Sequence, residues 1–225
     1  MQHGSSNTIR QARPTRREFA VFTLLTFLMI GSSAWAVRSL PSSGVVTAVF
    51  DGDTILLDTR DRVRYLGIDA PEVSHGKEAS DCMGEEAAKF HSQMVLHKRV
   101  FLHYDRERRD DHGRLLAYVH LPDGRCANVE LLRGGYAFVR RSREGFARLN
   151  EFLGIQREAV QARRGWWSKC PGTPAGEYLG NRRSFVLHVP HCPWGKRTEA
   201  RNRERFPSRW RAFEEGYRPC RECKP

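Results

Sequence analysis

Short runs of apolar residues, separated by turn residues, fill most of the chain between residues 43 and 139. Runs of this length bounded by Asp, Gly and Arg are typical of β-strands joined in a meander. The predicted strands are Val45–Phe50, Ile55–Asp58, Val63–Ile68, Val100–Tyr104, Leu115–Leu121 and Tyr136–Val139. Short strands with helices inserted between them predict a small closed barrel on which the helices pack.

Apolar residues at helical spacing predict helices in other segments. These helices are Glu85–His97, Asn128–Arg133 and residues 146–163. The expected buried side of the last helix is formed by Phe146, Leu149, Leu153 and Val160. The mixture of strands and inserted helices places the fold in the α+β class.

Composition divides the chain into segments with different roles. Residues 1–36 are a targeting segment, residues 37–42 a linker and residues 43–168 the barrel domain. A linker rich in Pro and Gly is expected over residues 169–183. The remaining residues, 184–225, form a basic tail that carries three of the six cysteines.

The targeting segment has the organisation of an export signal. Arginines 10, 13, 16 and 17 precede the apolar run Phe19–Ile30, and the small-residue site Ala34–Ala36 follows. This order predicts a cleaved secretory signal. The segment Thr15–Ala20 resembles the bacterial twin-arginine motif, with an ordinary export signal as the alternative. An uncleaved inner-membrane anchor over residues 18–37 is the other alternative. We therefore expect a periplasmic or secreted protein, with membrane contact only if the segment is not cleaved.

The net charge favours a polyanionic partner. The 225-residue chain has a formal charge of +12, and removal of residues 1–36, with four arginines and one glutamate, leaves +9. Such a charge suits nucleic acid, acidic lipid or acidic polysaccharide, although many exported proteins are basic without binding nucleic acid.

Three carboxylates of the stretch D-G-D-T-I-L-L-D-T-R-D-R-V-R-Y-L-G-I-D-A-P-E could face one site, and Arg64 lies between them in the sequence. Asp53, Asp69 and Glu72 are either solvated loop residues or part of a pocket that holds a metal ion and an anion together. Arg64 and Asp69 are five positions apart, so they would face opposite sides of a regular strand. They converge only if the strand ends or bends before Asp69, and Gly67 and the Asp-Ala-Pro turn favour such a bend.

Four motifs in this order resemble the staphylococcal nuclease (thermonuclease) family. They are V-x-x-V-x-D-G-D-T-I-x-L, R-x-x-G-I-D-A-P-E, R-D-D-H-G-R-x-L-A-Y-V and the Asn, Leu, Gly and Ala positions of Asn128–Ala137. The resemblance covers about residues 43–168. It implies a five-stranded OB-fold barrel with three helices and a Ca²⁺-dependent hydrolysis of DNA and RNA that leaves 3′-phosphate ends. The protein is expected to be a monomer without an organic cofactor.

The resemblance also implies a role for individual residues. Asp53, Asp69 and the backbone carbonyl of Ala70 match the calcium ligands, with Asp51 nearby. Glu72 matches the residue that accepts a proton from the attacking water or orients it, and Arg64 and Arg114 match the arginines that bind the phosphate. Hard oxygen donors and paired guanidiniums suit these roles chemically. A barrel that has lost catalysis and only binds nucleic acid or a partner is the rival interpretation. It is disfavoured because these acidic and basic positions are all present.

The chain departs from the family pattern where tyrosines are expected to contact the nucleotide. His112 stands before the Gly-Arg pair, and Arg141 and Arg143 occupy the later positions. With Arg140, these arginines are candidates for binding the nucleic-acid backbone. A charged surface without a binding role is the alternative.

The tail contains a second group of candidate ligands. His188-x₃-Cys192 and Cys220-x₂-Cys223 form two close pairs of the kind that bind structural Zn²⁺, with His191 as the alternative to His188. The ending G-Y-R-P-C-x-x-C resembles an Ada-like zinc-binding module. A disulfide within the tail is the alternative. Cys82, Cys126 and Cys170 allow three pairings, among which the sequence does not select.

Overall fold

The computed structural model describes residues 1, 39–74, 76, 79–141 and 145–225. The chain forms two compact units, Met1–Leu40 and Pro41–Pro225. Apart from Met1, the predicted export signal or anchor lies outside the described residues. Among the residues that are described, no helix is long and apolar enough to cross a membrane. The second unit contains all the elements discussed below.

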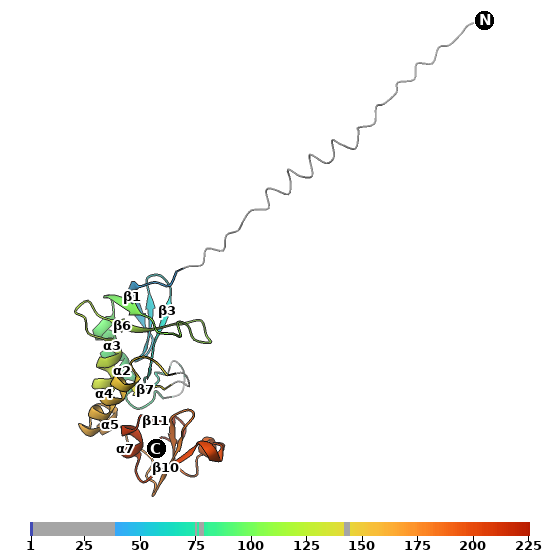
Figure 1. Ribbon diagram of the computed structural model, residues 1–225. Coiled ribbons are helices and arrows are strands. Elements are labelled where there is room, and N and C mark those ends of the chain that lie inside the picture. The colour runs from blue at the N-terminus through green and yellow to red at the C-terminus, as the bar shows by residue number, and fades with distance from the viewer. Residues whose placement is uncertain (2–38, 75, 77–78, 142–144) are drawn as a thin grey trace. The chain divides into compact units, whose positions relative to one another are not determined.

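A closed five-stranded barrel confirms the predicted fold class. Its strands are β1 (Ser43–Val49), β2 (Thr54–Leu57), β3 (Arg62–Tyr65), β5 (Arg99–His103) and β6 (Leu115–His120), in the order β1-β2-β3-β6-β5. Figure 1 labels β1, β3 and β6. Strands β3 and β6 pair in parallel, and the other neighbours are antiparallel. This mixed closed barrel is the architecture expected of an OB-fold.

The predicted strand Val63–Ile68 is divided in two. After Tyr65 the chain turns through Gly67, at φ +78°, and continues as β4 (Ile68–Asp69). Strand β4 pairs with β7 (Phe138–Val139) outside the barrel, and the predicted strand Tyr136–Val139 is therefore not a barrel strand. A Cβ at position 67 would lie 2.7 Å from the Phe146 ring, so the turn needs glycine for both backbone angle and space.

The expected helices are present with shifted ends. They are α2 (Gly84–Val95), α3 (Ala127–Arg133) and α4 (Leu149–Gln161), followed by the short α5 (Trp166–Lys169). Of the residues predicted to form the buried side, Val160 is fully buried, whereas Phe146, Leu149 and Leu153 are half-buried and Phe146 precedes α4. The fully buried stripe instead contains Phe152, whose ring packs against Tyr118 and Phe146.

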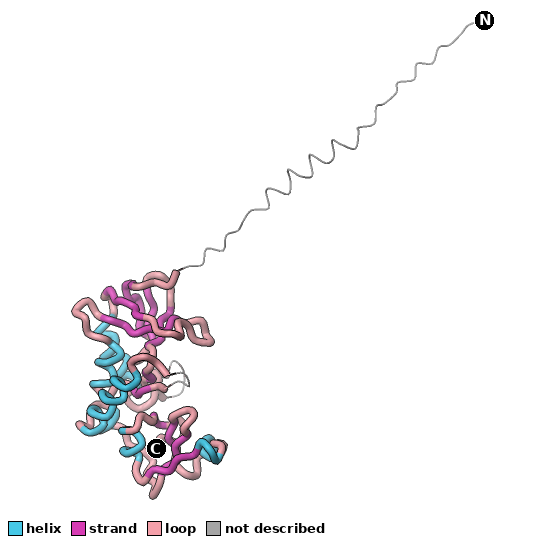
Figure 2. The backbone as a smooth tube through the Cα atoms, viewed as in Figure 1, coloured by secondary structure: helices cyan, strands magenta, loops and turns pink. Residues whose placement is uncertain are grey.

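The C-terminal module is a four-stranded sheet with short helices (Figure 2). The strands are β8 (Tyr178–Asn181), β9 (Val186–His188), β10 (Arg203–Phe206) and β11 (Arg218–Pro219), in the order β10-β8-β9-β11. The helical segments are α6 (Pro193–Lys196), η1 (Ala200–Asn202) and α7 (Arg209–Glu214). Because β8 lies within residues 169–183, that segment is not only a linker, and the module's sheet begins before residue 184.

The module shares a hydrophobic core with the barrel domain. Phe138, Trp166 and Trp167 belong to the same buried cluster as Leu187 and Phe213 of the module. Domain and module therefore form one compact unit, in which residues from both can meet at one site.

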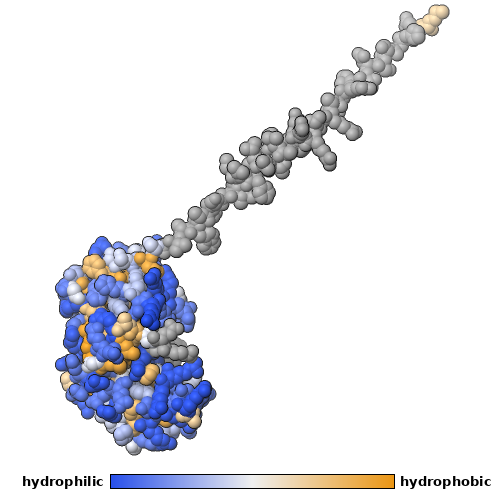
Figure 3. Space-filling model, viewed as in Figure 1, coloured by the Kyte–Doolittle hydropathy of each residue, from blue (hydrophilic) through white to orange (hydrophobic). Residues whose placement is uncertain are grey.

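The face drawn in Figure 3 is largely hydrophilic, with smaller hydrophobic areas.

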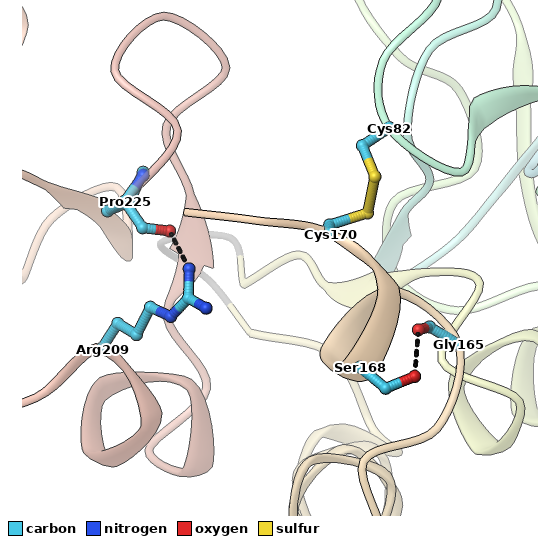
Figure 4. The surroundings of a disulfide bond; sticks show 6 residues. All are labelled: Cys82, Gly165, Ser168, Cys170, Arg209 and Pro225. Atoms are coloured by element: carbon cyan, nitrogen blue, oxygen red, sulfur yellow. Dashed lines mark hydrogen bonds between the residues drawn. A yellow bond between two sulfur atoms is a disulfide. The ribbon is translucent and has the colours of Figure 1, made fainter. Parts of the chain in front are cut away.

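A disulfide connects Cys82 and Cys170, which are 88 positions apart (Figure 4). It joins the loop before α2 to the residue that follows α5. Of the three pairings that the sequence left open, the structure forms this one, and Cys126 is a buried free thiol.

Candidate functional site

Arg64 lies between the carboxylates of Asp53 and Asp69. It forms an ion pair with Asp53, and its Nη2 lies 2.8 Å from Asp69 Oδ1. The three residues are 7%, 3% and 4% exposed, respectively. The bend between β3 and β4 thus gives Arg64 and Asp69 the convergence that a regular strand would not allow.

The turn Asp51–Asp53 places the first of these carboxylates. Asp53 N–H donates to Asp51 Oδ1 at 2.8 Å, which makes Asp51 a turn-forming residue. Ala70 N–H donates to Asp53 Oδ2 at 2.6 Å and holds the turn beside β4. A Cβ at Gly52 would lie 2.5 Å from Ala70 Cβ, so only glycine permits this approach. Asp53 is therefore a neighbour of Ala70 and, through Arg64, of Asp69.

Burial and neighbouring charges together raise the pKa of Asp53 and lower the pKa of Asp69. Burial raises the pKa of Asp53 to about 7, although Arg64 opposes the shift. Burial would also raise the pKa of Asp69, but Arg218 and Arg64, with smaller effects of Arg221 and Arg140, lower it overall. Asp69 is consequently ionised even without a metal ion, because guanidiniums surround it.

Glu72 lies in the loop that follows β4. Its N–H donates to Asp81 Oδ2 at 3.2 Å, and its carbonyl accepts from Asp81 N–H at 2.9 Å. Helix α2 begins so close that a Cβ at Gly84 would lie 2.4 Å from the Glu72 carbonyl oxygen. The backbone of Glu72 is therefore fixed, while half of its side-chain surface remains accessible to solvent. An accessible carboxylate on a fixed backbone is suited to act on a water molecule.

Arg114 shares a cleft with Arg64 and Arg140. Its Nε lies 2.7 Å from Asp110 Oδ2, so Asp110 orients the guanidinium. Two guanidiniums from different parts of the chain thus line one cleft, which is the arrangement that binds a phosphate group from two sides.

The remaining basic candidates lie in different surroundings. His112 is exposed, and its N–H donates to Asp110 Oδ1 at 3.0 Å. Arg140 Nη1 lies 3.6 Å from Asp69 Oδ1. The guanidinium of Arg141 stacks over Phe185 of the module at 3.6 Å from the ring centroid, and burial lowers its pKa. Arg143 lies outside the described residues.

His91 is a buried residue near the site, and no sequence motif pointed to it. Its Nδ1 lies 2.8 Å from the Asp51 carbonyl oxygen, and its Nε2 lies 2.8 Å from Tyr65 Oη. Because a carbonyl only accepts, Nδ1 carries the proton and Tyr65 donates to Nε2. Burial lowers the pKa of His91 to about 4, so the ring is neutral near pH 7. His91 lies with Ala87 and Met94 on the buried face of α2, and this helical spacing is a signal of burial but not of the role.

Two arginines of the module also reach the site. Arg218 Nη1 lies 3.3 Å from Asp69 Oδ2, and Arg221 Nη2 lies 3.5 Å from Asp69 Oδ1. Arg221 Nη1 also lies 2.8 Å from Glu72 Oε1. They stand on either side of Cys220, and no feature of their sequence indicated contact with residues about 150 positions away.

The predicted ligands of the tail lie together as a Cys/His cluster. One ligand atom from each of His188, Cys192, Cys220 and Cys223 lies within 4.8 Å of the others. His191 is exposed and outside this cluster, and the three cysteines are free thiols rather than disulfides. Three thiols and one imidazole suit a tetrahedral site for a metal such as zinc.

The carboxylate site has the donor chemistry of a different metal. Asp53 and Asp69 offer buried oxygen atoms, as hard divalent cations such as Ca²⁺ prefer. Burial raises the pKa of Asp53, and a cation beside the carboxylate would favour its ionised form. The residues present therefore fit a divalent cation at this site.

A family model and several known proteins match this chain. The sequence model described as "Staphylococcal nuclease homologue" matches residues 62–169. A thermonuclease of Staphylococcus intermedius is 41% identical over 98 residues, which cover 42% of this chain and 58% of that protein. An uncharacterized endonuclease of Escherichia coli O157:H7 is 34% identical over 146 residues, which cover 63% of this chain and 87% of that protein. Endonuclease YncB of Bacillus subtilis is 36% identical over 124 residues, 53% of this chain and 58% of its own length. The chain thus spans less than two thirds of some of these relatives.

Proposed function

The chain belongs to the staphylococcal nuclease homologue family, and we propose that it is a calcium-dependent nuclease that hydrolyses phosphodiester bonds of DNA and RNA. One observation carries the proposal: Arg64 lies between two buried carboxylates and lines the same cleft as Arg114. The names of its relatives, a thermonuclease and endonucleases, support it.

The roles of the residues follow from their positions. Asp53, Asp69 and the Ala70 carbonyl would hold the Ca²⁺ ion, which when bound supplies positive charge against the developing charge of the phosphoryl group. Glu72 accepts a proton from the attacking water. Arg64 and Arg114 bind the phosphoryl oxygens from two sides and stabilise the charge that builds on them. By the family resemblance, the products carry 3′-phosphate ends.

We also propose that the C-terminal module holds a structural zinc ion. His188, Cys192, Cys220 and Cys223 would hold it, and the ion would connect the end of β9 to the residues that follow β11. The Cys82–Cys170 disulfide supports an oxidising compartment, and with the export signal predicted over residues 1–36 it favours a periplasmic or secreted protein.

Cleavage assays with purified protein test the function. We expect hydrolysis of single-stranded DNA and RNA when Ca²⁺ is added to metal-depleted protein whose zinc content has been restored. The variants Arg64→Gln, Arg114→Gln and Glu72→Gln should each lower kcat by about 10²-fold or more, because each removes a group that acts on the transition state. Arg205→Gln is the matched control, since Arg205 pairs with Glu177 on the exposed surface of the module.

Several outcomes would contradict the proposal. Hydrolysis that proceeds without added Ca²⁺, or that is unchanged in the Glu72→Gln variant, removes the proposed mechanism. Binding of nucleic acid without hydrolysis by the unaltered protein would instead support a barrel that only binds. End-group analysis of the products tests the expected 3′-phosphates.

A further inference from the structure

Arg218 and Arg221 belong to the C-terminal module but contact the carboxylates of the proposed nuclease site. Arg218 contacts Asp69, while Arg221 contacts both Asp69 and Glu72. Arg221 Nε also lies 3.9 Å from Asp81 Oδ2. One guanidinium of the module thus faces both a proposed metal ligand and the proposed proton acceptor.

The module holds these two arginines on a fixed backbone. Arg218 N–H donates to the Phe185 carbonyl at 2.9 Å, and Cys220 N–H donates to the Leu187 carbonyl at 3.0 Å. These bonds belong to the parallel pairing of β11 with β9. Cys220, between the two arginines, is also a member of the Cys/His cluster. The sheet and the cluster therefore fix the backbone from which both side chains extend toward Asp69.

The contact network around Asp69 contains as many guanidiniums as carboxyl groups. In the described part of the chain, the ion pairs around Asp69 join four carboxylates to four guanidiniums. These are Asp53, Asp69, Glu72 and Asp81 with Arg64, Arg140, Arg218 and Arg221. A divalent cation on Asp53 and Asp69 would add two positive charges and take up carboxylate oxygens that the arginines now contact. The guanidiniums would then have donors free for another anion.

Arg221 is also open to a ligand. Its side chain is 46% exposed, whereas that of Arg218 is 22% exposed. It lines a pocket together with Asp69, Asp81 and Lys224. A nucleic-acid strand at the proposed site carries further phosphates on either side of the bond that is cleaved. With Asp69 engaged by a cation, Arg221 would be placed to bind such a phosphate.

Resting on the proposed nuclease function, we propose that Arg221, supported by Arg218, is a phosphate-binding residue of the nuclease site that the C-terminal module supplies. The module is then a part of the substrate site rather than a separate appendage. Its arginines neutralise the carboxylates before the metal ion binds and contact the phosphate backbone afterwards.

Binding measurements test this role without relying on catalysis. The probe is a fluorescent single-stranded oligonucleotide with nuclease-resistant phosphorothioate linkages, titrated with Ca²⁺-loaded protein at several salt concentrations. Arg221→Gln should weaken binding about tenfold at low salt. It should also reduce the slope of log affinity against log salt by about 0.7, the value for one contact to a single-stranded phosphate. Arg205→Gln should change the slope much less, since Arg205 pairs with Glu177.

The affinity for Ca²⁺ alone gives a second readout, measured by calorimetry. Arg221→Gln should raise this affinity, because the variant removes a positive charge that competes for Asp69 and Glu72. At saturating Ca²⁺ the same variant should raise KM for DNA. Circular dichroism and zinc content, compared between the two variants, check that the module remains folded.

Two results would overturn the inference. If Arg221→Gln increases cleavage at saturating Ca²⁺ and leaves the salt slope unchanged, Arg221 blocks the site rather than binding substrate. If affinity, slope and KM all equal those of Arg205→Gln, the contacts of Arg221 are only structural. Neither result contradicts the proposed nuclease function. That proposal is contradicted separately if the unaltered protein does not cleave DNA or RNA.

Discussion

Gln156 Nε2 donates a hydrogen bond to the Phe213 carbonyl oxygen at 2.8 Å. Its Oε1 accepts from Val139 N–H at 2.6 Å, and the residue is 1% exposed. Val139 lies on β7, which pairs with the strand that carries Asp69, while Phe213 lies on α7 of the module. One buried amide on α4 therefore joins the strand pair of the carboxylate site to the module that supplies Arg218 and Arg221.

Gln156→Met should destabilise the protein by about 2–4 kcal/mol. The substitution keeps the volume but leaves a buried backbone N–H and a buried carbonyl without their partners, and each unsatisfied group costs about 1–3 kcal/mol. Urea unfolding measures the change. Gln161→Met is the control, because Gln161 is the exposed last residue of the same helix and should change stability by less than about 0.5 kcal/mol. Equal stability of the two variants would show that the Gln156 amide is not needed.

His91 should make the folded state sensitive to acid. Its pKa is about 4 in the folded protein, below the ordinary value of 6.5, because burial disfavours the charged ring. Above about pH 6.5 both the folded and the unfolded state hold the neutral ring, and the stability is fully present. As the pH falls from about 6.5 to about 4, the unfolded state binds the proton first, so stability is lost. The loss should reach about 3 kcal/mol, because each tenfold difference in proton affinity between the two states corresponds to about 1.4 kcal/mol.

Urea unfolding at a series of pH values measures this loss. His91→Gln should flatten the curve between pH 6.5 and pH 4, because the neutral amide can donate to the Asp51 carbonyl and accept from Tyr65 without titrating. His191→Gln should keep the slope of the unaltered protein, since His191 is exposed. An unchanged slope in His91→Gln would assign the acid sensitivity to other groups.

The sequence predicted the parts of the carboxylate site that lie close together along the chain. Asp53, Arg64, Asp69 and Glu72 occur within about twenty residues, in motifs whose turns determine their positions. Gly67 signalled the bend that brings Arg64 and Asp69 together, and the structure places a left-handed turn there. The Cys/His pairs were equally recognisable, because short ligand spacings are a local feature.

The sequence did not predict features that depend on packing between distant segments. Arg218 and Arg221 lie in a segment whose composition is that of an ordinary basic surface. Only the docking of the module brings them to Asp69. Strand β8 contains Gly180 and follows a segment rich in Pro and Gly, so its pairing partners and not its propensity make it a strand. The disulfide between Cys82 and Cys170 was one of three possible pairings in the sequence, because cysteine spacing does not determine which cysteines are bonded.

Loss of the Cys82–Cys170 disulfide should lower stability by about 2–5 kcal/mol. The bond joins positions 88 residues apart, so it restricts a long loop of the unfolded chain. The double variant Cys82→Ser/Cys170→Ser removes it without leaving an unpaired thiol, and urea unfolding measures the change. A phosphine reductant should destabilise the unaltered protein by a similar amount and leave the double variant unchanged. If the reductant acts equally on both proteins, the disulfide is not the source of the stability.

The Cys/His cluster should bind zinc through His188 and not through His191. His188 is buried and lies within ligand distance of the three thiols, whereas His191 is exposed and outside the group. We expect stoichiometric zinc in protein purified without chelators, measured by elemental analysis. His191→Ala should retain it, and His188→Ala should lose most of it during dialysis against a chelator, because a tetrahedral structural site then lacks one of its ligands.

Zinc loss should also loosen the module, because metal binding at such a site contributes directly to folding. The zinc-free protein should expose the amides of β9 and β11 to hydrogen exchange, while the barrel strands β1 and β2 remain protected. Full zinc in His188→Ala together with loss in His191→Ala would reverse the assignment of the ligand. The absence of zinc from the unaltered protein, with the module still protected, would mean that hydrogen bonds and core packing alone hold Arg218 and Arg221 beside Asp69.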